Sequence, residues 1–186
     1  MLTVSVLKSL ETPSLVVREM RKADASELAC FMTQSRYQRF ISHRLKDEAA
    51  VREFLLRQVA IQGDFRRHIF HLAAEERFSG EVVGDGFLIV HPDKAVEIGW
   101  GLHPALWRAG LGTEIGSALL AMAFERLSAE RVWCKVMKPN IASARLAAHI
   151  GMTCFDSRTD FPVGHGRLEA VDFFEMTVHT YHVRTY

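Results

Sequence analysis

The sequence predicts a mixed α/β fold, in which a mostly antiparallel central sheet of about seven strands packs against helices. One observation behind this is a series of short β-rich runs between residues 68 and 102, separated by turn residues as in an antiparallel meander. The other is the alternation of helix-like and strand-like segments from residue 111 onwards. The chain has 186 residues without a linker or repeat, so residues 1–186 are expected to form one domain.

The first part of the chain predicts one strand and two helices before the meander. The run SLVVREM (14–20) is short and β-branched and follows Pro13, which suits a strand. Helices are expected from Asp24 to about Gln34 and from Asp47 to Ala60, where apolar residues recur at helical spacing. Three strands follow, at HIFHLAAEE (68–76), GEVVGDGFLIV (80–90) and AVEIGWGL (95–102).

The second part predicts a long helix, a strand, a short helix and two strands. The helix from about residue 111 to 127 is apolar on one side and carries Glu114, Ser117 and Glu125 on the other, so it should pack along a sheet. The remaining elements are the strand RVWCKVM (131–137), the helix NIASARLAAHI (140–150) closed by Gly151, and the strands MTCFD (152–156) and VDFFEMTVHTY (171–181).

Composition and charge argue against several partners. The net charge of +1 disfavours nucleic acid, because proteins that track phosphates usually carry a marked basic excess. No signal-peptide pattern opens the chain and no run approaches ~18 uninterrupted apolar residues, so we expect a cytoplasmic protein without a membrane partner.

No metal is expected either. The cysteines, Cys30, Cys134 and Cys154, lack CxxC spacing, which predicts neither a zinc cage nor a disulfide framework. Cys134 is expected to be a small buried residue of a strand rather than a nucleophile. The pairs His68/His71 and His179/His182 are three residues apart in strand-like contexts, a spacing that puts the two side chains on opposite faces.

The turn before the long helix predicts an anion site. The first amides of a helix have no internal partners and lie at the positive end of its dipole. Gly110 and Gly112 remove side chains that would keep an anion away, and Arg108 adds a donor. On two glycines alone, a tight strand-to-helix turn is the simpler interpretation. The segment lacks a P-loop, and Ile115 stands where a dinucleotide motif has its third glycine.

Residues 96–152 hold an ordered set of motifs: a Glu-Ile-Gly-aromatic strand, His-Pro, Trp-x-x-Gly-x-Gly-Thr-Glu, a long helix, a strand, Asn-x-x-Ser and a helix ending in Gly. In this order they resemble the GCN5-related N-acetyltransferase (GNAT) superfamily, specifically its RimJ/RimL-like ribosomal-protein N-terminal acetyltransferase branch. More faintly, the similarity covers nearly the whole chain. Ser14 and Leu15 replace an Arg-Leu pair common in the branch, and Met152 replaces a usual Phe, which loosens the subfamily and substrate assignment.

The resemblance implies the GNAT fold, with helices on both faces of the sheet, and acetyl-CoA as cosubstrate. Its pantetheine would lie beside the fourth expected strand near Leu102. Asn140 would contact the cofactor or brace the turn. Gly99 and Gly101 share a face of that strand with Glu97, so the backbone there could be approached closely, although packing glycines are an equal alternative. The implied pyrophosphate seat is the turn of Arg108, Ala109, Gly110, Leu111, Gly112 and Thr113.

Acetyl transfer is expected by direct attack of the amine in a ternary complex. A backbone N–H near Leu102 could polarise the thioester carbonyl. Many superfamily members protonate the thiolate with a tyrosine, whose matching place here is Ala147. In the branch the candidate is Ser143, although Asn140 and Ser143 also fit a helix N-cap and its N3 residue.

Glu97 is the first choice for the base, because a carboxylate in a largely apolar strand should lie near the reacting centre. An ion pair with an arginine is the alternative fate of Glu97. Asp160, Glu169 and a water chain are alternative bases.

The acceptor is expected to be a primary amine, either a protein N-terminal α-amine or a small molecule such as a polyamine, amino acid or aminoglycoside. Region 36–68 carries eight Arg or Lys against four acids and should cover the acceptor site in this fold. It favours an acidic or phosphate-bearing acceptor, unless it is simply a solvated face. Tyr37 and Phe40 either line the pocket or belong to the core. The second hypothesis, prompted by Ala147, is a catalytically silent acyl-CoA-binding or sensing domain. A monomer or homodimer is expected.

Overall fold

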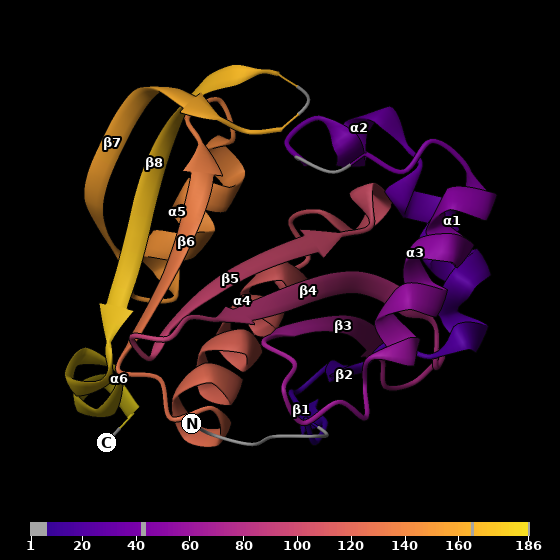
Figure 1. The fold of residues 1–186 in the computed structure, drawn as a ribbon, viewed down its shortest axis with the longest axis horizontal. Coiled ribbons are helices and arrows are strands. Elements are labelled where there is room, and N and C mark those ends of the chain that lie inside the picture. The colour runs from indigo at the N-terminus through magenta and orange to yellow at the C-terminus, as the bar shows by residue number, and fades with distance from the viewer. Residues whose placement is uncertain (1–6, 42–43, 165, 186) are drawn as a thin grey trace.

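The computed structural model describes residues 7–41, 44–164 and 166–185 (Figure 1). The predicted strands at Ala95–Leu102 and Arg131–Met137 have the expected bounds. The strands of the described chain are β1 (Leu10–Glu11), β2 (Leu15–Glu19), β3 (Ile69–Glu76), β4 (Val82–Val90), β5 (Ala95–Leu102), β6 (Arg131–Met137), β7 (Thr153–Pro162) and β8 (Leu168–Thr177).

These strands form one sheet in the order β1-β2-β3-β4-β5-β6-β8-β7. β5 and β6 run parallel, and the other neighbouring pairs are antiparallel. The predicted mixed, mostly antiparallel sheet is therefore confirmed. The strand added to the expected seven is the two-residue β1.

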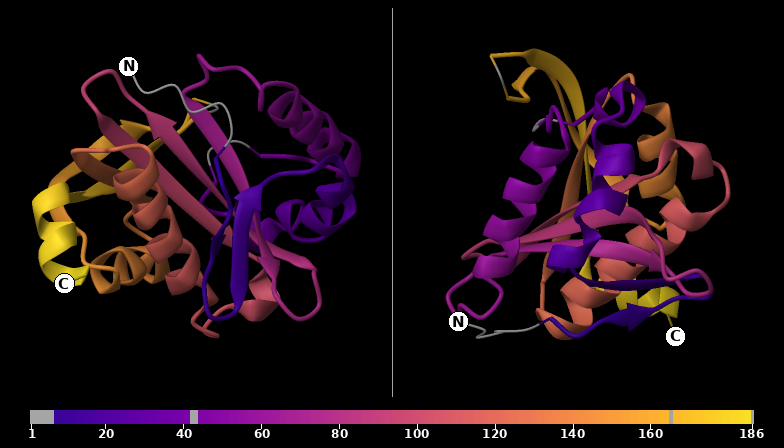
Figure 2. Two further views of the ribbon diagram at one scale, coloured as in Figure 1. Left: turned by 90° about the horizontal axis from the view of Figure 1, so that it is seen from below. Right: turned by 90° about the vertical axis from the view of Figure 1, so that its right-hand side faces the viewer.

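Helices cover both faces of the sheet, as predicted (Figures 1 and 2). None of the helices in the described ranges is long and apolar enough to cross a membrane. The α-helices are α1 (Ala25–Met32), α2 (Ser35–Gln38), α3 (Glu48–Ala60), α4 (Leu111–Ala121), α5 (Ile141–His149) and α6 (Val178–Thr185), and α4 continues as a π-helical turn over Met122–Arg126.

Three predicted elements differ from the structure. The helix expected over 24–34 ends at Met32, and a further helix, α2, follows it after the extended Gln34. The strand expected over 152–156 continues to Pro162. The strand expected over 171–181 ends at Thr177, which pairs with Arg131, the first residue of β6. Residues beyond Thr177 have no strand to pair with, and they form α6 instead. His179 and His182 therefore lie three apart on a helix and not on opposite faces of a strand. The described residues hold no cluster of three or more His, Cys, Asp or Glu suited to a metal ion.

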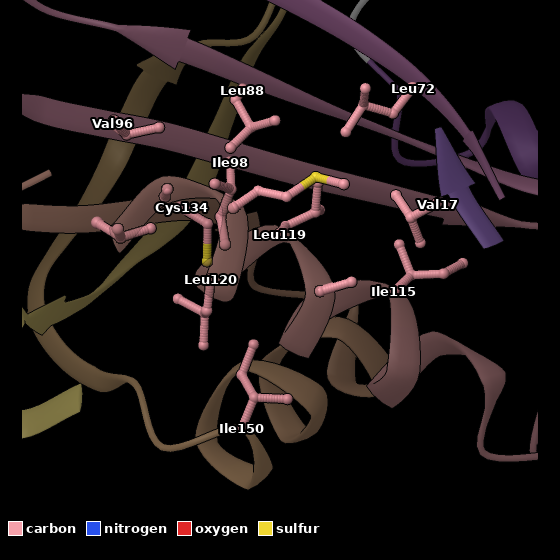
Figure 3. Close-up of a cluster of buried hydrophobic side chains, with 14 of the residues drawn as sticks. Val17, Leu72, Leu88, Val96, Ile98, Ile115, Leu119, Leu120, Cys134 and Ile150 are labelled. Carbon is pink, nitrogen blue, oxygen red and sulfur yellow. The ribbon is translucent and has the colours of Figure 1, made fainter. Parts of the chain in front are cut away.

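Alternation along the strands divides the core between the two faces of the sheet. On one face, Leu88 and Ile98 pack with Ile115 and Leu119 of α4 (Figure 3). On the other face, Ala73 packs with the apolar side chains of α1 and α3. α3 begins at Asp47, whose side chain accepts a hydrogen bond of 2.8 Å from the amide of Ala50.

The sheet opens between its two parallel strands. β5 and β6 pair at Ala95, Val96 and Glu97, and beyond Glu97 they separate. β6 continues to pair with β8 as far as Met137. The last five residues of β5, 98–102, therefore present one backbone edge without a β6 partner.

Candidate active site

A cavity of about 1210 Å³ lies where β5 and β6 separate. Its walls come from β5 and β6, the facing parts of β3 and β4, the turn before α4, the start of α5, the α1–α2 region, α3 and the loop between β7 and β8. This volume exceeds that of typical single-ligand pockets, so two substrates can be accommodated together. Eight of the predicted site residues line it: Glu97, Leu102, Arg108, Gly110, Gly112, Thr113, Asn140 and Ser143. Ala109 and Leu111 belong to the same turn but are outside this lining.

The turn before α4 has the geometry of a helix N-terminus that is open to a ligand. Arg108 and Gly110 have positive φ values of 74° and 84°. The amide of Thr113 donates to the carbonyl of Gly110 at 2.9 Å, so the amides of Leu111 and Gly112 precede the first hydrogen bonds of the helix. Such amides, at the positive end of the helix dipole, suit an anion.

The two glycines of this turn serve different purposes. A Cβ on Gly110 would meet no atom within 4 Å, so glycine is favoured there by the backbone conformation. A Cβ on Gly112 would lie 2.9 Å from Leu146 Cδ1 of α5. The space at Gly112 is therefore used by the contact with α5, a reason that the sequence interpretation did not include.

Glu114, an acidic residue in the first turn of α4, is directed away from the anion site. Its carboxylate accepts hydrogen bonds from Thr12 Oγ1 at 2.5 Å and from the amide of Ser14 at 2.9 Å. Burial acts to raise the pKa of Glu114, but these hydrogen bonds lower it below its ordinary value. Ser14, a departure from the branch pattern, thus has a structural role in joining β2 to α4.

Trp107 joins the turn to two neighbouring elements. Its indole Nε1 donates to the carbonyl of Leu102 at 3.0 Å. The guanidinium of Arg36, from α2, lies over the Trp107 ring at 5.0 Å from its centroid. The end of β5, the anion-binding turn and α2 are therefore held together at the cavity rim.

Asn140 caps α5, the structural alternative considered for it. Its Oδ1 accepts from the amide of Ser143 at 3.3 Å. The Ser143 side chain lines the cavity, and within the described residues its hydroxyl makes no hydrogen bond. Ala147, the residue matched with the tyrosine of the resembled superfamily, is fully buried in the main core.

The carboxylates among the described cavity-lining residues are Glu97 and Asp85. Glu97 is 6% exposed, and its Oε1 lies 2.9 Å from Lys135 Nζ. The alternative fate of an ion pair is thus observed, with lysine in place of arginine. The alternative bases Asp160 and Glu169 are outside the lining, bonded to Thr159 Oγ1 at 3.0 Å and Arg167 at 3.1 Å respectively.

Asp85 was missed by the sequence interpretation. It lies on β4, where the Tyr37 hydroxyl donates to its Oδ1 at 2.5 Å. Burial raises the pKa of the Asp85 carboxyl to about 6, although the hydrogen bond from Tyr37 acts to lower it. Burial and the adjacent carboxylate raise the pKa of Tyr37 well above its ordinary value, so the phenol remains a donor. The signal in the sequence was an aspartate between two glycines, Gly84 and Gly86, inside a strand.

Gly99 and Gly101 leave room for side chains of neighbouring elements. A Cβ on Gly101 would overlap both the Tyr37 hydroxyl and Asp85 Oδ1. A Cβ on Gly99 would overlap the Phe87 ring. The close approach expected at these glycines is therefore made, on this face, by side chains of α2 and β4.

Most of the basic residues in region 36–68 form ion pairs. Arg52 and Arg57 form exposed i,i+4 pairs with Glu48 and Glu53, and Arg67 forms a largely buried pair with Glu19. Arg36 and Arg39 line the cavity. Positive charge is thus left at the cavity rim.

Burial and the charge of Glu97 raise the pKa of the Cys134 thiol to about 12. The thiol is therefore neutral, as expected of a buried strand residue.

Comparison with known proteins gives this site a family. The family model "Acetyltransferase (GNAT) domain" matches residues 14–153. An uncharacterized N-acetyltransferase of Bacillus subtilis (strain 168), YoaA, is 25% identical over 144 residues, which cover 76% of this chain and 81% of that protein.

Two solved structures have a similar fold at low identity. The ribosomal-protein-S5-alanine acetyltransferase of Vibrio fischeri has a TM-score of 0.78 at 16% identity, covering 91% of this chain and 96% of that chain. A spermidine N-acetyltransferase of Vibrio cholerae, in complex with CoA and spermine, has a TM-score of 0.78 at 13% identity, covering 91% and 99%. Since the family model spans the sheet from β2 to the first residue of β7, the chain belongs to the GNAT family of acetyl-CoA-dependent N-acetyltransferases.

Proposed function

We propose that this protein is a RimJ/RimL-type enzyme that transfers the acetyl group of acetyl-CoA to the α-amine of a protein N-terminus. The observation that carries the proposal is the separation of β5 from β6 beyond Glu97, with the open N-terminus of α4 beside it. This arrangement offers an unpaired strand edge and an anion seat to one extended ligand.

The residues present fit acetyl-CoA on both counts. The turn of residues 108–113 offers backbone amides and the Arg108 side chain to the pyrophosphate. The unpaired backbone of β5 up to Leu102 offers donors and acceptors to the amides of pantetheine, much as a strand edge accepts a peptide. Asn140 supports this seat by starting α5 beside the cavity.

The predicted chemistry needs a proton donor for the departing thiolate and an acceptor for the proton of the amine. Ser143 is proposed as the donor, since its uncommitted hydroxyl lines the cavity. A backbone N–H near Leu102 is proposed to polarise the carbonyl. The sequence favours Glu97 as the acceptor of the amine proton. The pairing of Glu97 with Lys135 partly compensates its charge, so Gln at this position should disturb Lys135 as well.

Charge at the cavity rim supports the acceptor class. The solved relatives are named for acceptors as different as a ribosomal protein and spermidine, so similarity alone does not choose. Arg36 and Arg39 line the cavity, and they have no ion-pair partner among the described residues. Two cations at the entrance favour a peptide with acidic residues near its amine and disfavour a polyamine.

The test combines binding and turnover in one preparation. Acetyl-CoA is titrated calorimetrically, and thiol release is then followed with alanine- or serine-initiated peptides, acidic or neutral, and with spermidine. We expect binding, together with the highest kcat/KM on acidic peptides, and a large loss of turnover with retained binding in Ser143→Ala. Binding without turnover on any amine would favour the silent acyl-CoA-binding domain. Preference for spermidine would contradict the acceptor class, and absence of binding would contradict the proposal as a whole.

A further inference from the structure

We propose that Asp85, held in position by Tyr37, is the group that binds the acceptor ammonium and takes its proton. The inference rests on the proposed acetyltransferase function and assigns the base to β4 in place of β5. It is carried by the place of Asp85 in the cavity and by the charges around it.

Asp85 lies beside the unpaired end of β5. It is in register with Gly101, and the side chains of directly opposed residues share a face of the sheet. Glu97, four residues earlier on β5, is on that face too, at the point where β5 and β6 still pair. Of the two cavity carboxylates, Asp85 is therefore the one next to the open part of β5, where the thioester is proposed to lie.

The charges distinguish the two carboxylates further. Glu97 has a cation 2.9 Å away in Lys135. Asp85 has the neutral Tyr37 hydroxyl as its hydrogen-bond partner, and no ion pair joins it to a cation among the described residues. A shielded anion without a cation is costly, so an ammonium group entering the cavity gains more at Asp85 than at Glu97.

Among the described residues, burial and the hydrogen bond from Tyr37 determine the pKa of Asp85. Arg36 of α2 and Arg39, which follows α2, also line the cavity, but their guanidinium groups lie over the rings of Trp107 and Phe40. His71 of β3 lies 6.1 Å from the Phe87 ring, and His103 after β5 lies 5.7 Å from the Phe31 ring of α1. The other titratable or charged groups among the described cavity-lining residues are Arg108, Cys134, Arg145, His149 and the Glu97–Lys135 pair. With a pKa of about 6, the Asp85 carboxyl is mostly ionised at neutral pH, and it is a stronger proton acceptor than an ordinary carboxylate.

The proton balance is complete with groups already named. The acceptor arrives as an ammonium, and one proton passes from its nitrogen to Asp85. The freed lone pair forms the bond to the acetyl carbonyl carbon, and the C–S bond breaks with its electron pair on sulfur. Ser143 gives a proton to the thiolate and is reprotonated by the second proton that the nitrogen loses as the amide forms. Asp85 returns the first proton to water through the cavity.

The experiment measures kcat and kcat/KM against pH for wild type, Asp85→Asn and Glu97→Gln, with an alanine-initiated peptide as acceptor, and the acid limb is taken from kcat/KM, which reports the pKa values of the free enzyme. We expect a wild-type acid limb near the pKa of Asp85. Asp85→Asn should lower kcat at neutral pH by about 100- to 1,000-fold and remove that limb. The remaining rate should rise with the fraction of the acceptor amine that is unprotonated. Glu97→Gln should keep the limb. Glu53→Gln, which removes an exposed carboxylate of α3 outside the cavity, serves as the control.

Tyr37→Phe tests the positioning role and keeps the inference testable if Asp85→Asn folds poorly. Because the hydrogen bond from Tyr37 lowers the pKa of Asp85, its loss should move the acid limb to higher pH. A purely structural role would lower kcat or the melting temperature without moving the limb.

Three outcomes would overturn the inference. One is an Asp85→Asn enzyme with the wild-type profile, and another is loss of the acid limb in Glu97→Gln alone, which would make Glu97 the base. The third is a Tyr37→Phe enzyme whose acid limb lies at the same pH as that of the wild type. A wild-type protein that binds acetyl-CoA but acetylates no amine would overturn the proposed function and this inference together, which separates that failure from the others.

Discussion

At the scale of single residues, Gly101 determines whether the Tyr37–Asp85 pair can form. The pair occupies the space that a side chain at residue 101 would need, and the two partners are 48 residues apart in the chain. Glycine is required at this position because it has no side chain. Its backbone freedom is not needed, since its φ is not positive. The active-site geometry therefore depends on a missing methyl group.

Replacing Gly101 by Ala should disturb the pair directly. We expect a loss of stability of about 1–3 kcal/mol from overpacking and a fall in turnover, because Tyr37 and Asp85 must move. Urea unfolding and the peptide assay measure both effects. Gly63→Ala is the matched control, since a Cβ there meets no atom within 4 Å and should change stability by no more than about 1 kcal/mol. Full activity in Gly101→Ala would show that the pair tolerates displacement.

At the scale of elements, the start of α4 combines an anion seat with a helix–helix contact. Gly110 provides the left-handed turn before the helix, and Gly112 lets α5 approach through Leu146. The anion seat and the α5 contact thus fall within three consecutive residues. Substitutions at the two glycines should separate their effects.

Gly110→Ala should weaken both stability and acetyl-CoA binding. A left-handed backbone costs a residue with a Cβ about 1–2 kcal/mol, and relieving that strain would displace the amides of the turn. Gly112→Ala should change stability by less than about 1 kcal/mol, because a Leu146 methyl can shift and alanine favours the helix. Urea unfolding and calorimetric titration distinguish these results. Weaker binding in Gly112→Ala, with stability unchanged, would support the sequence interpretation that this glycine clears space for the anion.

At the scale of the whole molecule, local signals predicted the sheet but not the contacts across it. The bounds of β5 and β6 followed from alternating apolar runs between turn residues. The strand predicted up to Tyr181 was wrong where α6 forms. This end of the chain is β-rich in sequence, but β8 stops where its partner strand β6 begins, at Arg131. The motifs of residues 96–152 led to the cofactor side of the cavity. The Tyr37–Asp85 pair was not predictable in this way, because it joins α2 to β4 only when the chain has folded.

The position of Asp85 also gives the whole molecule a characteristic dependence of stability on pH. In the folded state its pKa is about 6, against about 3.9 for an exposed aspartate. Between these values the folded protein binds more protons than the unfolded chain, so this group makes stability fall as pH rises from about 4 to 6. The contribution is up to about 3 kcal/mol, reduced to the extent that the cavity admits water to the carboxyl. Glu114 and Asp156, whose pKa values are lowered, act in the opposite sense, but equally in wild type and in an Asp85 variant.

Asp85→Asn should therefore gain stability relative to wild type as pH rises. Asparagine keeps an oxygen for the Tyr37 hydroxyl but carries no charge, so the difference in unfolding free energy should grow in its favour between pH 4 and 7 by as much as about 3 kcal/mol. Urea unfolding of both proteins across this range measures the difference without any acceptor amine. Parallel curves would mean that Asp85 titrates in the folded protein as it does in the unfolded chain. A growing difference would mean that the fold retains an ionised carboxylate at a cost in stability, as expected when a group serves catalysis and not folding.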